Sequence, residues 1–224
     1  MNNLALLKLM HLVSPALPVG AYAYSQGQEW AVDSAWVNSE PEVEAWIMGV
    51  LGSSVAYLDL PCLSRLYDAW QTNDLAAISY WNNFIFAARE THELLLEDQQ
   101  MGIALSRLLV SLAITEHQQA ELTLKKPSFI AMFALAGVKW NIPLDALKQG
   151  FVWSWLEAQV GVATKIVPLG QTQAQQMLTR MIPKVDGVID RANGLEDHEL
   201  GMGLPALAIA SSLHERQYSR IFRS

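Results

Sequence analysis

The sequence is dominated by residues that favour helices, and this constrains the fold most. Leu and Ala together supply 59 of the 224 residues, whereas Val, Ile and Thr, of which Val and Ile especially favour strands, supply 34. No convincing run alternates between apolar and polar residues. Apolar residues instead recur at steps of three and four, as one helix face requires. The longest such series is Leu144, Leu147, Phe151, Trp155, Ala158, Val162 and Ile166. The chain is therefore expected to form one compact all-α domain, residues 1–224, of about nine helices.

Capping residues and prolines place the expected helices. Asn3 is expected to cap the first helix, and Ser39 with Glu42 has the spacing of a capping box. Pro61 is expected to open a new helix, because proline is favoured in a first helical turn, and Pro183 is expected to produce a kink. The helices are predicted at 4–13, 24–31, 39–52, 59–70, 74–89, 90–113, 129–140, 144–166, 171–189 and 205–216.

Composition excludes several classes of protein. With 51% hydrophobic and 17% charged residues, the chain has enough apolar surface for a large core and is not disordered. Its one cysteine, Cys62, excludes an internal disulfide framework. The net charge of −7 argues against nucleic-acid binding. The charge-free stretch 9–28 is broken by two prolines, and 45–58 is too short to span a bilayer. A cytoplasmic protein without a membrane span is expected.

The sequence lacks the motifs of common enzymes. It contains no phosphate-binding loop of the form G-x-x-x-x-G-K-S/T, no G-x-S-x-G elbow and no H-E-x-x-H zinc motif. The five histidines, His117 among them, are scattered without the spacing of metal ligands. We therefore expect a binding protein with no catalytic residues, no resident metal and no cofactor. The alternative is a weak metal site at His198, which stands between Glu196, Asp197 and Glu199.

Three segments have the composition of contact surfaces. The apolar segment 14–29 is stiffened by two prolines, and it either packs under the domain or faces a partner. In segment 165–176, Lys165 closes an apolar helix, where it either complements the helix dipole or anchors an interface. The tail 214–224 alternates arginines with aromatic and apolar residues. It either frays in solvent or docks on a partner and becomes ordered there, and the second is preferred because Tyr and Arg are enriched at binding hot spots.

These segments make the chain resemble the urease accessory protein UreF family nearly from end to end. The resemblance rests on Ser14-Pro-Ala-Leu-Pro-Val-Gly20, Tyr24-Ser-Gln-Gly27 with Glu29, Arg89-Glu-Thr91, Glu97-Asp98, Met101-Gly102, Lys165, Val167-Pro-Leu-Gly-Gln171, Gln217-Tyr-Ser-Arg220 and Phe222-Arg-Ser224. The chain departs from the family pattern at Gln28, where an apolar residue is expected, and at Leu95, where an arginine is common.

The resemblance implies a non-enzymatic, all-helical protein that forms a homodimer in the cytoplasm. It implies binding to the UreD/UreH accessory protein and to the GTPase UreG, in a complex that delivers nickel to apo-urease. Carried over by motif, the UreD/UreH contacts would be Tyr218, Arg220, Phe222 and Arg223. Lys165, Pro168 and Gly170 would face the G protein or the second copy. The remaining expected partner-binding residues are Pro15, Leu17, Pro18, Tyr24 and Glu29. A stand-alone nickel carrier that uses the His198 region remains the alternative function.

Overall fold

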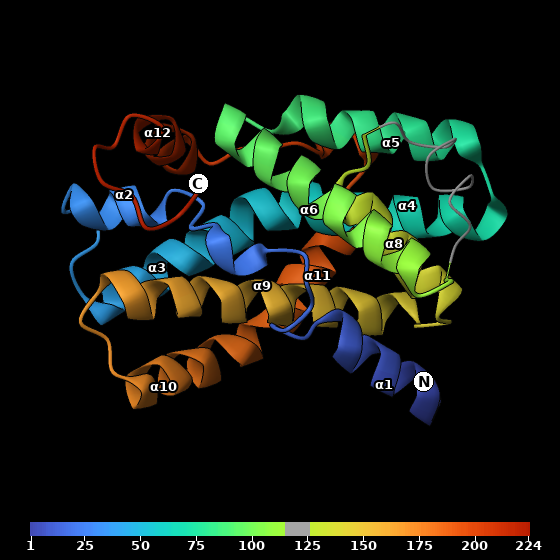
Figure 1. Cartoon of the computed structure of the whole chain (residues 1–224), viewed down its shortest axis with the longest axis horizontal. Helices are drawn as coiled ribbons and strands as arrows, with labels where there is room; N and C mark the ends of the chain where they lie inside the picture. The colour runs from blue at the N-terminus through green and yellow to red at the C-terminus, as the bar shows by residue number, and fades with distance from the viewer. Residues whose placement is uncertain (115–125) are drawn as a thin grey trace.

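The computed structural model describes residues 1–114 and 126–224, and all regular elements of these two ranges are helical (Figure 1). Two helical runs are continuous, at residues 40–72 and 171–193, so these ranges hold nine separate helical rods in one compact domain. The predicted all-α domain of about nine helices is therefore confirmed. The α-helices are α1 (Asn3–Leu12), α2 (Gln28–Asp33), α3 (Glu40–Val50), α4 (Leu60–Thr72), α5 (Leu75–Ala88), α6 (His92–Ser111), α8 (Phe129–Lys139), α9 (Leu144–Ile166), α10 (Gln171–Met181), α11 (Val185–Asn193) and α12 (Pro205–His214).

Helices α4, α8 and α9 form the centre of the molecule. Helix α8 packs against α4 and α6, and its residues 130–136 are all buried. Helix α9 extends along the molecule between the α6–α8 layer and the α10 helix (Figure 1). Its predicted apolar face is buried at Leu147, Phe151 and Val162, but Val152 and Leu156, which lie outside that face, are also fully buried. The buried part of α9 is thus wider than predicted, because neighbours cover the helix on more than one side.

The expected break between residues 52 and 59 is absent. A π-helical segment (Leu51–Asp59) joins α3 to α4 without interruption, and Pro61 lies inside the run. Pro61 has no N–H to give to the carbonyl four residues before it, which belongs to Tyr57. That carbonyl instead accepts the backbone N–H of Gly201 at 2.9 Å. A distant loop therefore satisfies the group that proline leaves without a donor, and the helix continues.

Two expected caps also differ from the observed ones. Asn2, rather than Asn3, caps α1 by accepting the amide of Ala5 at 2.7 Å. Ser39 precedes α3 as expected, but its hydroxyl donates to Glu42 at 3.0 Å instead of accepting a helix amide. Glu42 in turn accepts the amide of residue 38. Helix α6 ends at Ser111, two residues before the predicted end at 113, and His117 lies outside the described residues.

The run Glu40–Thr72 is long and apolar enough to cross a membrane by length and composition alone. The sequence-based statement that the stretch 45–58 is too short is therefore wrong, because the helix continues through Pro61. However, 61% of the apolar window is buried inside the protein. Helices α5, α8 and α11 pack against this run. Its apolar residues form part of the core, as in a soluble all-helical protein.

Gly102 allows the closest approach between α6 and the segment before α8. A Cβ atom at this position would overlap the carbonyl of Pro127 and the backbone of Ser128. Backbone atoms cannot move aside as a flexible side chain can. The contact explains why the Met101-Gly102 pair needs glycine.

We predict that Gly102→Ala lowers the free energy of unfolding by about 1–3 kcal/mol, the usual range for overpacking. Urea denaturation followed by circular dichroism measures the effect. Gly187→Ala in α11 is the matched control, because a Cβ there meets no atom within 4 Å. It should raise the free energy by about 0.5–1 kcal/mol, as glycine is a poor helix former. Equal effects of the two substitutions would contradict the assigned contact.

Candidate partner-binding site

The end of the chain lies across residues 21–25, which follow the proline-rich loop (residues 14–20). We call residues 218–224 the C-terminal strap. Its Arg223 amide donates to the carbonyl of Ala23 at 2.8 Å, and the Ser25 amide donates to the carbonyl of Ser224 at 2.7 Å. The side chain of Phe222 is 5% exposed and Ser224 is fully buried. The strap therefore packs against its own chain in this structure, and docking of the tail 214–224 on a partner stays a prediction.

Glu29 fastens the strap from the first turn of α2. Its carboxylate accepts the amides of Ile221 at 2.7 Å and Phe222 at 3.0 Å, and its Oε2 lies 2.9 Å from Nε2 of His214. Gly27 allows α2 to come this near to α12, because its φ is +74° and a Cβ would lie 3.0 Å from the amide nitrogen of Ser211. Glu29 thus acts mainly as an internal anchor.

Glu93 of α6 completes this anchor. Its Oε2 lies 2.8 Å from Nδ1 of His214, and its Oε1 accepts an N–H of Arg220 at 2.8 Å. The two carboxylates and the imidazole are almost completely buried. Burying a charge is unfavourable unless it is paired. Here both carboxylates receive several donors.

A second polar cluster lies one turn farther along α6. Glu97 accepts the amide group of Gln26 at 2.8 Å and the hydroxyl of Ser224 at 2.9 Å, and Gln26 also accepts the indole N–H of Trp155 at 3.0 Å. Burial raises the pKa of Glu97 to about 7, although the hydrogen bonds from Gln26 and Ser224 act in the opposite direction. This cluster links the strap to α6 and α9.

Arg89 supports α6 from the other side. Its guanidinium contacts Asp59 at 2.6 Å and Asp98 at 2.7 Å. Burial disfavours the charged form of Arg89, but the two carboxylates outweigh burial and raise its pKa. For Asp59 burial is the stronger effect and raises the pKa, with Arg89 acting against it. The Arg89 and Asp98 of the family motifs therefore serve as a buried ion pair.

A cavity of about 370 Å³ lies between the proline-rich loop, α6, the π-helical segment and α9. Its wall is mainly apolar and includes Leu17, Leu94 and Trp155. Glu97 and Lys165 also line it, and both contact the strap: the ammonium of Lys165 lies 5.3 Å from the ring centroid of Phe222. The cavity and the strap thus share residues.

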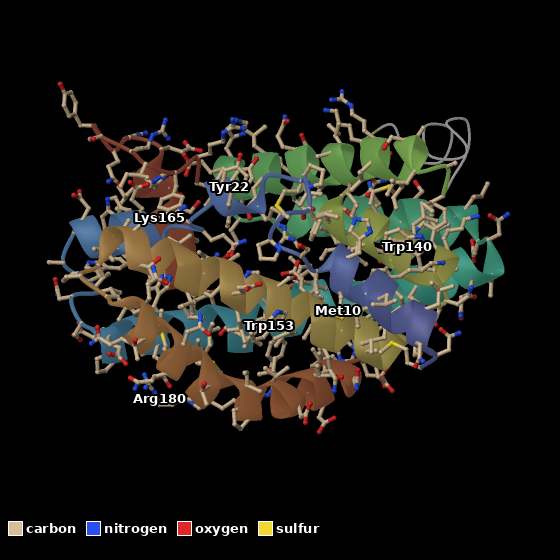
Figure 2. The ribbon with its side chains drawn as sticks, turned by 60° about the horizontal axis from the view of Figure 1, so that its bottom comes forward. Met10, Tyr22, Trp140, Trp153, Lys165 and Arg180 are labelled. Carbon is tan, nitrogen blue, oxygen red and sulfur yellow. The ribbon has the colours of Figure 1, made fainter. Side chains whose placement is uncertain are left out.

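Many of the predicted site residues lie in one region of the structure, but some are exposed and others are buried. Lys165 lies at the end of α9 on the same side as Tyr22 in Figure 2. Burial raises the pKa of Tyr24, and the nearby Glu97 raises it further. A hydrogen bond with Arg223 acts in the opposite direction. Pro168 and Gly170 lie in the turn between α9 and α10, where Gln173 accepts the amide of Gly170 at 2.9 Å. The exposed predicted residues are Pro15, Pro18, Lys165, Pro168, Gly170, Tyr218, Arg220 and Arg223, and the buried ones are Leu17, Tyr24, Glu29 and Phe222.

The list of predicted site residues omitted Glu93, Glu97 and His214. Glu97 stands in one of the family motifs, so the sequence did contain a signal for it. Glu93 and His214 are 121 positions apart and meet only in the folded chain. No local pattern marks such a pair.

The alternative metal site at His198 has little support from geometry. His198 is exposed, Asp197 pairs with Arg65 at 2.7 Å, and Glu199 accepts the amide of Glu196 at 2.8 Å. In the two described ranges, no three His, Cys, Asp or Glu side chains are grouped as metal ligands would be.

Gln28 is buried without hydrogen-bond partners for its amide oxygen or nitrogen among the described residues. We predict that Gln28→Leu raises the free energy of unfolding by about 1–3 kcal/mol, the usual penalty of an unsatisfied buried group. Urea denaturation tests this, with the exposed Gln176→Leu as a control that should change little. A loss of stability in Gln28→Leu would show that the amide is satisfied in solution.

Glu97 should make stability depend on pH. The folded chain keeps a proton on Glu97 up to about pH 7, whereas the unfolded chain releases it near 4.5. The contribution of Glu97 to the free energy of unfolding is therefore fully present below pH 4.5, and it is lost as the pH rises towards 7. Glu97→Gln should reduce the fall in stability across this window, measured by urea denaturation at several pH values. The exposed Glu215→Gln should keep the wild-type slope, and a wild-type slope in Glu97→Gln would contradict the prediction.

Comparison with known proteins agrees with the family motifs. Residues 37–182 match the UreF family. The urease accessory protein UreF of Teredinibacter turnerae is 60% identical over 224 residues, which cover 100% of both chains. UreF of Hahella chejuensis is 45% identical over 225 residues, again covering 100% of both chains. UreF of Marinobacter nauticus is 47% identical over 223 residues, covering 100% of this chain and 96% of the relative. The resemblance read from the motifs is confirmed, and the chain belongs to the UreF family of urease accessory proteins.

Proposed function

We propose that this chain is a cytoplasmic scaffold that joins the UreD/UreH accessory protein and the GTPase UreG in the complex that delivers nickel to apo-urease. Membership of the UreF family implies a role in urease maturation, and it is consistent with a non-catalytic protein. The main observation in support of the scaffold role is the strap. Its backbone is held by buried groups, while several of its side chains are exposed. Tyr218 is fully exposed, and Ile221 is 68% exposed although its amide is bound to Glu29.

Further apolar side chains are exposed on α1. Leu4, Leu7 and Met10 are each about 60% exposed on one side of this helix, and Figure 2 shows Met10 on the outside. Such a group is typical of a surface that another protein covers. This supports a subunit that is completed by partners. The homodimer that the resemblance implies stays a prediction, which light scattering of the purified chain tests.

The partner of the strap is proposed to be the UreD/UreH protein, which would contact Tyr218, Arg220 and Arg223. Phe222 would act by holding the strap in place, since it is buried under Lys165. Lys165, Pro168 and Gly170 would face the G protein or the second copy. Nickel is the cargo of the complex, and the cavity with Asp59, Glu90 and Glu97 in its wall supports an internal route.

We predict that Tyr218→Ala weakens capture of the UreD/UreH protein by at least about tenfold, as loss of an aromatic hot spot does. The measurement is co-purification after co-expression, followed by titration of the purified chains. Tyr218 makes no buried contact, so its removal should leave the fold unchanged. Deletion of residues 214–224 is a poorer test, because it would leave Glu29 and Glu93 buried without their donors.

Tyr80→Ala is the matched control, because Tyr80 is an exposed tyrosine on α5, outside the strap. It should bind UreD/UreH like the unmodified chain. Equal binding by Tyr218→Ala and the unmodified chain would contradict the role of the strap. Hydrolysis of GTP by the purified chain alone would contradict the assignment of that activity to the partner.

A further inference from the structure

His214 has a carboxylate at each of its two ring nitrogens. Nε2 lies 2.9 Å from Glu29 and Nδ1 lies 2.8 Å from Glu93. The side chain is 0% exposed, so water does not take the place of either carboxylate. Both distances are those of hydrogen bonds between nitrogen and oxygen.

A neutral imidazole cannot make both contacts. It carries one N–H, and its other nitrogen presents a lone pair. If Glu29 and Glu93 are both ionised, that lone pair would face a carboxylate oxygen at less than 3 Å, which is repulsive. Two short contacts to ionised carboxylates therefore require protons on both ring nitrogens.

The other hydrogen bonds keep both carboxylates ionised. Glu29 also accepts the two strap amides of Ile221 and Phe222, and Glu93 also accepts Arg220. N–H donors of this kind favour the charged form of a carboxyl group. The shared proton therefore belongs to the ring. With His214 charged, two cations balance two anions, whereas a neutral ring would leave a net negative charge in a buried place.

We propose that His214 is a doubly protonated imidazolium in the folded chain, and that this second proton fastens the C-terminal strap. The imidazolium joins α2, α6 and α12 at one point, directly below the two amides that Glu29 binds. The charged or titratable groups near the site are Glu29 from α2, Glu93 and, one turn farther, Glu97 from α6, and Arg220 from the strap.

Loss of the second proton would act on the strap through Glu29. One carboxylate would lose its hydrogen-bond donor from the ring. The two negative charges would then repel each other, and Arg220 would be the one positive charge left beside them. Water would have to enter to solvate them, and the simplest path is release of the strap. High pH is thus expected to open the strap before the core unfolds.

Nitrogen-15 NMR of the labelled full chain tests the protonation state directly. At pH 7.5, correlations from the ring protons should show both nitrogens of His214 protonated. The exposed His198 serves as the internal reference for a ring that is not buried between two carboxylates. A neutral His214 ring in a chain whose strap amides remain protected would overturn the proposal, since the proton would then be on a carboxyl group or absent.

Amide hydrogen exchange tests the link to the strap. In His214→Gln, the amides of Ile221, Phe222 and Arg223 should exchange at least about tenfold faster than in the unmodified chain, because a charge-assisted hydrogen bond is lost. Amides of α4 should be unchanged. His198→Gln is the control and should leave the strap amides within twofold. Unchanged strap protection in His214→Gln would overturn the proposal.

If His214→Gln fails to fold, Glu93→Gln in the full chain decides the matter. Removal of one negative charge should make the His214 ring lose its second proton at a lower pH, and the strap amides should lose protection at that same lower pH. Glu215→Gln should change neither. In Glu93→Gln, the pH at which the His214 ring loses its second proton and the pH at which the strap amides lose protection should shift together. A shift in one without the other would overturn the proposal. None of these measurements needs a partner, so they are independent of the proposed scaffold role.

Discussion

The carboxylate of Glu29 joins the two ends of the chain, because it is buried and must find its donors inside the protein. It finds them in the amides of Ile221 and Phe222 and in the ring of His214. The rest of this region follows from that requirement: Gly27 lets α2 approach α12, and Glu93 balances the imidazole on its other side. A polar network of this kind specifies one arrangement, since any other would leave a buried charge without a partner.

The sequence predicted most of the fold because helices depend on local information. Spacing of apolar residues located α9, and Pro183 lies in the short 3-10 segment that joins α10 to α11. The break expected before Pro61 was wrong for a reason that is not local. The amide that satisfies Tyr57 belongs to Gly201, which no pattern around Pro61 could reveal.

The candidate site was predicted less completely, for the same reason. Glu29 was expected as a contact residue from its motif, but its burial was not, because that depends on α12 and the strap. Phe222 looked like a side chain in need of a partner, and it found one in the ammonium of Lys165 on its own chain. Which exposed residues bind which partner depends on surfaces of other proteins, and those surfaces are not encoded in this sequence.

The strap also limits the order in which the chain can fold. The strap residue Ser224 is hydrogen-bonded to Ser25, which lies 199 positions earlier in the chain. Closing so long a loop carries a large entropic penalty, and it cannot begin until both segments exist. During synthesis the helices from α3 to α9 can pack from local contacts, while Glu29 and Glu93 remain hydrated. The space beside Glu29 and Glu93 is then filled only when residues 214–224 have left the ribosome, so newly made chains pass through a form in which these two carboxylates are open to water.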